Sequence, residues 1–274
     1  MAGDPVPAVT EAEATGETAA IYADIRAATG VAVVNLVWRN LAVTPGALPW
    51  CWQRVRPLYV SGRAAAEGAA LAAALPLPTL PEAPPQALSA LGLGDADRAA
   101  IGTLLRSYFR TNAMNFLTLS ALAADLAGQS GAERAPAPPA SVTAEGALPK
   151  LPTFDEMPED VATLVGALDA LGERDGRVVA SMWRHLAHWP AFLAFAWALV
   201  APLEADGRLR PAIAAGIAAG RERALGLVGT LAPPESDPRP DVRATIADTL
   251  DLFTTHPIGK MLTICSLLRK ATAA

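Results

Sequence analysis

The chain has 274 residues, of which 52% are hydrophobic and only 18% charged, and its net charge is −5. This composition excludes a chain that is disordered throughout, and the acidic balance argues against nucleic acid or an anionic membrane as the main partner. Cys51 and Cys265 are too few for a disulfide scaffold, so we expect two buried thiols in a cytoplasmic protein. Residues 1–16 lack the basic and apolar regions of a signal peptide. The most apolar stretch, residues 191–203, is shorter than the roughly 20 residues of a membrane span, and predicts a core helix.

Helical periodicity runs through the first half of the chain, and no stretch alternates apolar and polar residues as a strand would. A first helix is expected to end at Thr29-Gly30, because glycine commonly follows a helix. Pro45 is expected to open a helix, since proline at the first helical position loses no hydrogen bond. A proline-rich loop follows at 75–85. The predicted helices of this half are 17–28, 31–43, 45–61, 63–74, 95–111 and 113–126.

A linker rich in Gly, Ala and Pro, residues 128–152, leads to a second series of helices. These are predicted at 156–172, 178–188, 190–205, 209–231, 241–255 and 258–272.

The second half repeats the first with an offset of 145 residues, as from Trp38 to Trp183. Residues 33–63 and 178–208, aligned without gaps, are identical at 14 of 31 positions. We therefore predict an all-α fold of two tandem helical repeats, residues 1–127 and 153–274, packed as an intramolecular pseudo-dimer. Matched residues are interpreted as duplicated structure: Trp38, Trp52, Trp183 and Trp197 as core, and Arg39 and Arg184 as structural cations.

Familiar catalytic motifs are absent: the sequence has no phosphate-binding loop, no nucleophile elbow and no zinc-binding HExxH. His185 and His188 share a helical face, but no third ligand has suitable spacing. We therefore predict neither a metal nor a cofactor.

Residues that break the internal symmetry are the best candidates for a pocket, because a duplicated core needs the same packing in both copies. Asn35-Leu36-Val37 corresponds to Ala180-Ser181-Met182. Arg110-Thr111-Asn112 corresponds to Thr255-His256-Pro257. A single site between the two copies would use such unequal positions.

Four stretches carry a family resemblance: IYADIR at 21–26, VWRNLAVTPG at 37–46, RTNAMNFLTLSAL at 110–122 and ASMWRHLAHWP at 180–190. In order and spacing they resemble the group I, non-stereoselective 2-haloacid dehalogenases. The resemblance covers most of the chain and is weakest in the linker and the proline-rich loops.

The resemblance implies two helical repeats with the active site between them, and a cofactor-independent hydrolase. An aspartate of that family activates water, which displaces halide directly from the carbon next to a carboxylate. The asparagine that helps to hold the water corresponds to Asn112, and the serine before the aspartate corresponds to Ser181. The aspartate position itself is Met182, and a thioether accepts no proton.

Three readings stay open. The chain is a diverged dehalogenase with weak or altered activity on 2-haloalkanoic acids, or it uses another base, with His185 ahead of Asp175 and Glu173. Alternatively, it is a non-catalytic protein that binds a small carboxylic or apolar molecule, or an interaction partner, in an apolar cleft. A homo-oligomer is compatible with each reading. The cleft is expected between Val33, Leu36, Asn112, Ser181, Met182 and Phe253.

Overall fold

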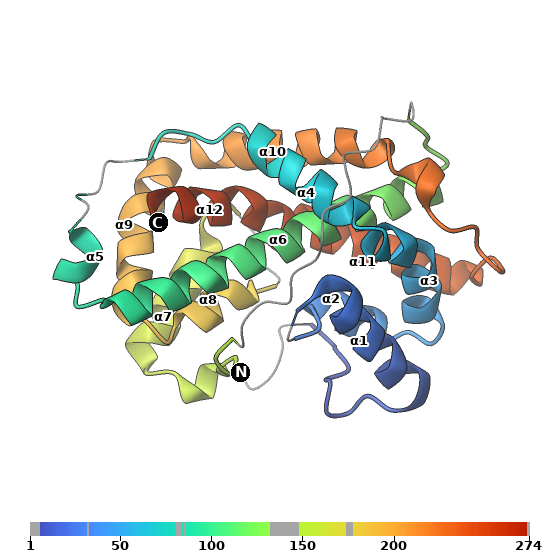
Figure 1. Cartoon of the computed structure of the whole chain (residues 1–274), viewed down its shortest axis with the longest axis horizontal. Helices are drawn as coiled ribbons and strands as arrows, with labels where there is room; N and C mark the ends of the chain where they lie inside the picture. The colour runs from blue at the N-terminus through green and yellow to red at the C-terminus, as the bar shows by residue number, and fades with distance from the viewer. Residues whose placement is uncertain are drawn as a thin grey trace.

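The computed structural model describes residues 6–31, 33–80, 84, 86–131, 148–173 and 178–272. Over these residues the chain is all-helical and has no β-strand, as the periodicity predicts (Figure 1). The α-helices are α1 (Gly16–Thr29), α2 (Leu36–Leu41), α3 (Ala47–Val60), α4 (Arg63–Ala74), α5 (Ala87–Ala90), α6 (Asp95–Leu126), α7 (Glu159–Ala170), α8 (Ser181–Leu186), α9 (Pro190–Ala205), α10 (Leu209–Leu225), α11 (Pro240–Thr255) and α12 (Pro257–Ala271). Two short 3-10 helices, η1 (Phe154–Glu156) and η2 (Val228–Thr230), complete the described elements.

The core is built around α6 and α12, which pack side by side through the middle of the molecule (Figure 1). Every residue of 111–122 in α6 and of 257–268 in α12 is buried. Their Leu117 and Leu262, which the repeat pairs with each other, are both fully buried. These segments are buried on all sides rather than on one face, because α4, α10 and α11 also pack against α6.

Helix bounds recur at the offset of the sequence repeat. α2 spans 36–41 and α8 spans 181–186, while α6 begins at Asp95 and ends at Leu126, and the α11–α12 pair begins at Pro240 and ends at Ala271. The copies differ in the middle of this long element. α6 is continuous, whereas the second copy breaks at His256, because Pro257 provides no N–H donor inside a helix.

Several predicted boundaries are wrong: the helices predicted at 31–43 and 178–188 are shorter, at 36–41 and 181–186, and the one predicted to reach 231 ends at Leu225. The helix predicted to end at Thr111 continues through Asn112 to Leu126, because asparagine is only a mild helix breaker and burial on all sides outweighs its propensity. The helix predicted to open at Pro45 begins at Ala47, after Gly46 with a left-handed φ of 87°.

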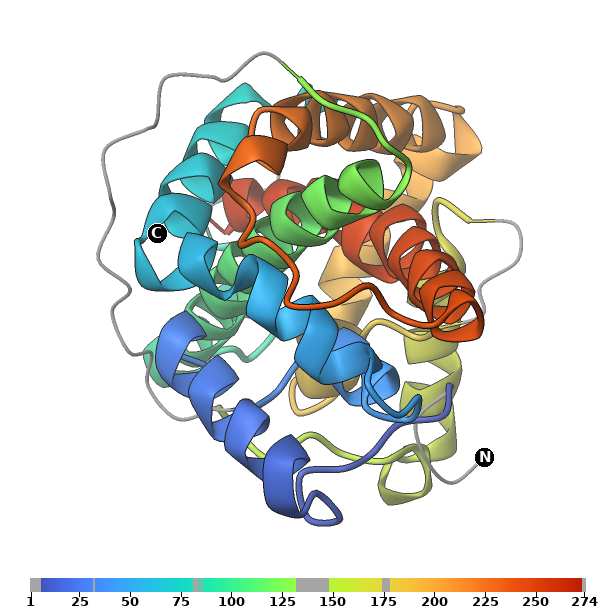
Figure 2. The same cartoon turned by 90° about the vertical axis from the view of Figure 1, so that its right-hand side faces the viewer.

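Besides the long helices, one short helix of each copy packs against the other copy. α2 of the first copy packs against α11 of the second, and α8 of the second packs against α6 of the first. Figures 1 and 2 show α3 and α11 together at one end of the molecule. The division at 127 and 153 stays a prediction, and residues 132–147 of the linker lie outside the described residues.

Three of the four matched tryptophans are core residues, as predicted, but Trp197 is 38% exposed. Its counterpart Trp52 donates its indole N–H to Asp24 at 2.7 Å. The aspartate equivalent to Asp24 is Asp169, which instead accepts from the Ala180 N–H and contacts Lys260. Trp197 therefore lacks the anchor that holds its counterpart against the core.

Cys51 and Cys265 are buried free thiols, as predicted, and burial raises the pKa of each. In the described part of the chain no helix is both long and apolar enough to cross a bilayer.

Candidate functional site

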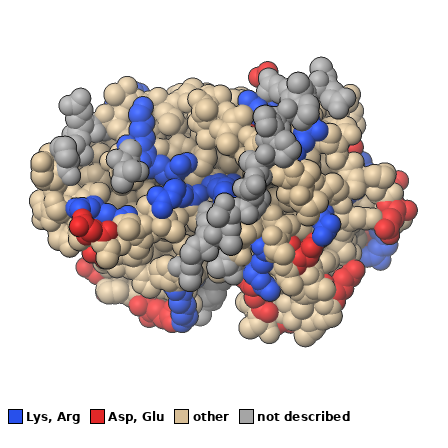
Figure 3. Space-filling model, viewed as in Figure 1, with Lys and Arg blue, Asp and Glu red and all other residues tan. Residues whose placement is uncertain are grey.

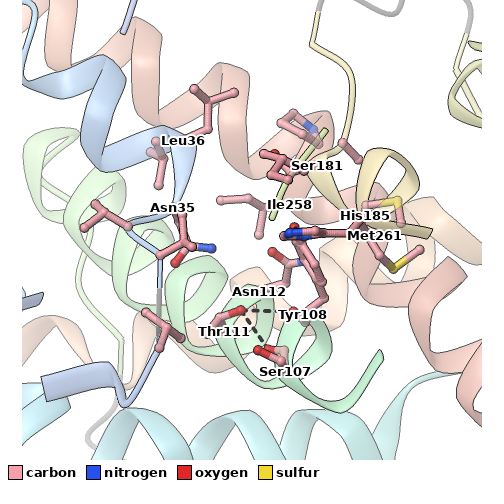
Figure 4. Close-up of a pocket in the computed structure, with 18 of the residues that line it drawn as sticks. Asn35, Leu36, Ser107, Tyr108, Thr111, Asn112, Ser181, His185, Ile258 and Met261 are labelled. Atoms are coloured by element: carbon pink, nitrogen blue, oxygen red, sulfur yellow. Dashed lines mark hydrogen bonds between the residues drawn. The ribbon is translucent and has the colours of Figure 1, made fainter. Parts of the chain in front are cut away.

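A cavity of about 80 Å³ lies where the short helices α2 and α8 face α6, α11 and α12 (Figure 4). A buried water needs about 10–15 Å³ of such space, so the cavity has room for several waters or for a molecule of a few heavy atoms. Its described lining residues are Val31, Val33, Val34, Asn35, Leu36, Val37, Arg39, Ser107, Tyr108, Thr111, Asn112, Leu148, Leu151, Val178, Val179, Ala180, Ser181, Met182, His185, Phe253, Pro257, Ile258 and Met261.

All seven residues selected from the sequence line this one cavity: Val33, Leu36, Asn112, Ser181, Met182, His185 and Phe253. Met182 and His185 are each 1% exposed, whereas Val33 is 42% exposed and lies at the rim. The structure thus brings the seven residues together, while their roles stay predictions.

Repeat-related positions face the cavity from opposite sides with different chemistry. Residues 33–37 line it from the first copy, and residues 178–182 line it from the second. Asn35 is thereby opposed by Ala180, and Leu36 by Ser181. The pairs Tyr108/Phe253 and Asn112/Pro257, also 145 residues apart, add to the same lining. The cavity is therefore polar on the side of α6 and apolar on the side of α11 and α12.

Two side-chain amides project into the cavity, those of Asn35 and Asn112 (Figure 4). The Oδ1 atom of Asn35 is buried without a hydrogen-bond partner. An unsatisfied buried acceptor costs about 1–3 kcal/mol, so a ligand or water that donates to it would be bound favourably. Asn35 belongs to the symmetry-breaking patch of the sequence but was not among the seven selected residues.

Tyr108 is a lining residue that the sequence reasoning missed, although its repeat partner Phe253 was selected. Its hydroxyl lies 2.5 Å from Nδ1 of His185, and Nε2 of His185 lies 3.0 Å from the Pro149 carbonyl oxygen. A carbonyl only accepts, so Nε2 of the neutral ring carries the proton and Tyr108 donates to Nδ1. Both ring nitrogens are thus engaged.

Burial sets the ionisation of this pair. It lowers the pKa of His185 to about 4, against the opposing effect of the Pro149 carbonyl, and it raises the pKa of Tyr108. Both groups are therefore neutral at pH 7, and His185 is a much weaker base than a free imidazole.

The segment 148–152 is hydrogen-bonded to α8 and to the turn that follows it. The carbonyl oxygens of Pro149, Lys150 and Pro152 accept hydrogen bonds from His185, His188 and Arg184. Leu148 and Leu151 of the same segment line the cavity. The two histidines considered as metal ligands in the sequence are thus bonded to backbone, and no cluster of three potential metal ligands occurs among the described residues.

No aspartate or glutamate belongs to the described lining of the cavity. Glu173, considered as a substitute base, lies 3.0 Å from Lys260 Nζ and 3.2 Å from His256 Nδ1, and is not a lining residue. Asp175 lies outside the described residues. Among the described residues that line the cavity, Arg39 is the only one with a permanent charge.

Comparison with known proteins gives a match by structure alone. No protein-family model matches the chain, and no curated protein matches its sequence. A solved D-2-haloacid dehalogenase mutant has a TM-score of 0.78 at 14% identity, covering 99% of this chain and 97% of that one.

Two further solved structures agree. A D-2-haloacid dehalogenase mutant in complex with D-2-CPA has a TM-score of 0.73 at 15% identity, covering 99% of this chain and 97% of that one. A D-2-haloacid dehalogenase in complex with L-LA has a TM-score of 0.77 at 14% identity, covering 99% and 98%. The chain thus has the all-helical fold of the D-2-haloacid dehalogenases over nearly its whole length, and the family resemblance is confirmed at the level of the fold.

Proposed function

We propose that this protein binds a small carboxylic acid in the cavity between its helical repeats, and that it hydrolyses carbon–halide bonds weakly or not at all. The observation that carries the proposal is the absence of a carboxylate from the described lining, where Met182 occupies the position of the family's aspartate. The solved structures that resemble this chain are dehalogenases, so we interpret the site as derived from that of a hydrolase.

Direct displacement of halide by water needs a base within hydrogen-bond reach of that water. His185 is the nearest candidate, but its Nδ1 already accepts from Tyr108 and its Nε2–H is bonded to Pro149. Water could lose a proton to His185 only through the Tyr108 hydroxyl. A ring whose pKa is about 4 draws that proton weakly, so we expect little halide release.

The lining suits a short acid with an aliphatic substituent. The amide groups of Asn35 and Asn112 offer N–H donors to a carboxylate. Ile258 and Met261 provide an apolar wall for the substituent. The volume of about 80 Å³ excludes a ligand of drug-like size.

The chemical half of the proposal is tested by restoring the carboxylate. Halide release from 2-chloropropionate is measured for the wild type, Met182→Asp and Met182→Asn. We expect release from Met182→Asp alone, because asparagine has nearly the same shape but accepts no proton. Adding Asn112→Ala to Met182→Asp should abolish the gained activity.

Wild-type release at or above the rate of Met182→Asp contradicts the proposal. If that wild-type activity disappears in His185→Ala, the histidine is the substitute base after all.

The binding half is tested by calorimetry with propionate and 2-chloropropionate. We expect both to bind the wild type, and Ser181→Trp, which fills the cavity from α8, to abolish binding. Circular dichroism controls for the fold of that variant. Absence of wild-type binding, or undiminished binding by a folded Ser181→Trp protein, removes this part of the proposal.

A further inference from the structure

A second, larger hollow lies on the outside of the molecule, where α4 and α12 flank the first half of α6. It is a groove of about 800 Å³, within the size range of ligand sites, and it shares no lining residue with the cavity between the repeats. Its described lining residues are Ala69, Ala72, Ala73, Leu77, Leu88, Asp95, Arg98, Ala99, Ile101, Gly102, Leu105, Arg106, Ser266, Arg269, Lys270 and Thr272.

One wall and the floor of the groove are apolar. Ala69, Ala72 and Ala73 are three and four residues apart, so their methyl groups share one face of α4. Ile101 and Leu105 of α6 lie beneath at 2% and 0% exposure, so the apolar surface open to a ligand comes from these alanines and from the half-buried Leu77 and Leu88. Side chains no larger than methyl groups on α4 keep the space between the helices open, and an aliphatic chain would be buried there without losing any hydrogen bond.

The other wall carries positive charge. Arg98 and Arg106 come from α6, and Arg269 and Lys270 come from the last turn of α12. Figure 3 shows blue side chains gathered on this face, over the region where α6 and α12 run together. Asp95 is the one carboxylate in the described lining, and it is already paired with Arg98. The concentration of cations is unusual for this chain, whose net charge is −5.

Two of these cations are held in place by neutral groups. The guanidinium of Arg269 lies over the Phe109 ring, 4.7 Å from its centroid, and Nη2 of Arg106 donates to Thr103 Oγ1 at 3.0 Å. Among the described residues no carboxylate pairs with Arg106, Arg269 or Lys270. These contacts orient the side chains while leaving N–H donors for an anion.

We propose that this groove binds the anion of a medium-chain fatty acid. The carboxylate lies against Arg106, Arg269 and Lys270, and the aliphatic chain lies along the alanine face of α4 beside Leu77 and Leu88. Charge alone suits any anion and the apolar wall alone suits any hydrocarbon, so the joint presence of both selects a molecule with one acidic end and an alkyl chain.

The test is calorimetric titration of the full chain with decanoate, decanol, acetate and inorganic phosphate. We expect decanoate to bind with one site per chain, and each of the other three compounds to bind at least about tenfold more weakly. Phosphate binding as tightly as decanoate, or acetate binding as tightly by the Ser181→Trp variant whose cavity between the repeats is filled, marks the patch as a general anion surface and overturns the proposal. Equal binding of decanol overturns the role of the charges.

Variants locate the site. Arg106→Gln with Lys270→Gln should weaken decanoate binding at least about tenfold, whereas Arg239→Gln, at an exposed arginine outside the groove, should not. Ala69→Phe and Ala73→Phe fill the groove at exposed positions of α4 where folding tolerates the change, and each should abolish binding.

Ser181→Trp, which fills the cavity between the repeats, should leave decanoate binding unchanged. Loss of binding in Ser181→Trp, or full binding by both alanine variants, places decanoate elsewhere and overturns the proposal. The groove shares no lining residue with the cavity proposed to bind short acids. The outcome of one binding test therefore does not decide the other.

Discussion

Tyr108 in α6 and His185 in α8 form a hydrogen bond of 2.5 Å across the two copies of the repeat, with the tyrosine hydroxyl donating to Nδ1. The direction of this bond follows from the Pro149 carbonyl, which accepts a hydrogen bond from the Nε2–H of His185 and so leaves Nδ1 unprotonated. The pair occupies the polar side of the cavity, and its repeat partners, Phe253 and Asn40, do not reproduce it. A residue proposed from the sequence as a base is thus a buried, neutral hydrogen-bonding group.

Stability should depend on pH through His185. In the folded protein the pKa of His185 is about 4, below the value of 6.5 of a free imidazole. Above pH 6.5 the histidine is therefore neutral in both the folded and the unfolded chain, and its contribution to the free energy of unfolding is fully present. As the pH falls from 6.5 to 4 the unfolded chain takes up a proton that the folded chain does not. The free energy of unfolding should therefore fall, by about 3 kcal/mol in total.

Urea denaturation at pH 7 and pH 4.5 measures this dependence as a difference between proteins. His185→Gln should lose less stability between the two pH values than the wild type, while His188→Gln, at an exposed position, should behave as the wild type. The same pH dependence in His185→Gln and the wild type would assign it to other groups.

Tyr108→Phe should destabilise the protein by about 1–3 kcal/mol, because it leaves Nδ1 of the buried His185 without a donor. It should also weaken binding of short acids. The matched control is Tyr22→Phe, which removes a hydroxyl donating to the Val9 carbonyl far from the cavity. That variant should lose stability in thermal unfolding but keep the affinity for 2-chloropropionate; an equal loss of affinity in both variants would contradict a specific role of Tyr108.

The ion pair between Glu67 in α4 and Arg223 in α10 should matter far more than pairs at the surface. The atoms are 2.5 Å apart, and the Glu67 side chain is only 3% exposed. Arg223→Met removes one charged partner from a buried carboxylate and should cost about 1–3 kcal/mol, part of which Glu67→Gln should restore in the double variant.

Arg239→Met provides the comparison, since Arg239 and Asp241 are 75% and 71% exposed. Its free energy of unfolding should change by no more than about 0.5 kcal/mol. If Arg223→Met changes the free energy of unfolding as little as Arg239→Met does, Glu67 is stabilised without the arginine.

Replacing two helical glycines by alanine should change the stability of the protein in opposite directions. A Cβ at Gly220 in α10 would overlap the ring of Phe116, so Gly220→Ala should destabilise by about 1–3 kcal/mol. A Cβ at Gly166 in α7 meets nothing within 4 Å, so Gly166→Ala should stabilise by up to about 1 kcal/mol. Thermal unfolding of the two variants tests both signs, and destabilisation by Gly166→Ala would contradict the open surroundings of that residue.

The helical class, a repeat at an offset of 145 residues and the residues around the cavity could be predicted from the sequence. Helical periodicity is a local property, and an exact offset between copies pairs Trp38 with Trp183 and Leu117 with Leu262 without any coordinates. The same offset separated shared core from unshared positions, which is why Asn112, Ser181 and Met182 were found to lie around one cavity.

The hydrogen bonds and ion pairs around that cavity could not be predicted from the sequence. The bond between Tyr108 and His185 joins residues 77 positions apart, and the pairing of Glu173 with Lys260 joins residues 87 apart. No periodicity encodes such contacts, because they depend on how α8 and α12 are placed against the rest of the chain. The continuity of α6 through Asn112 and the exposure of Trp197 have the same origin, since burial and side-chain anchors, not local propensity, set them.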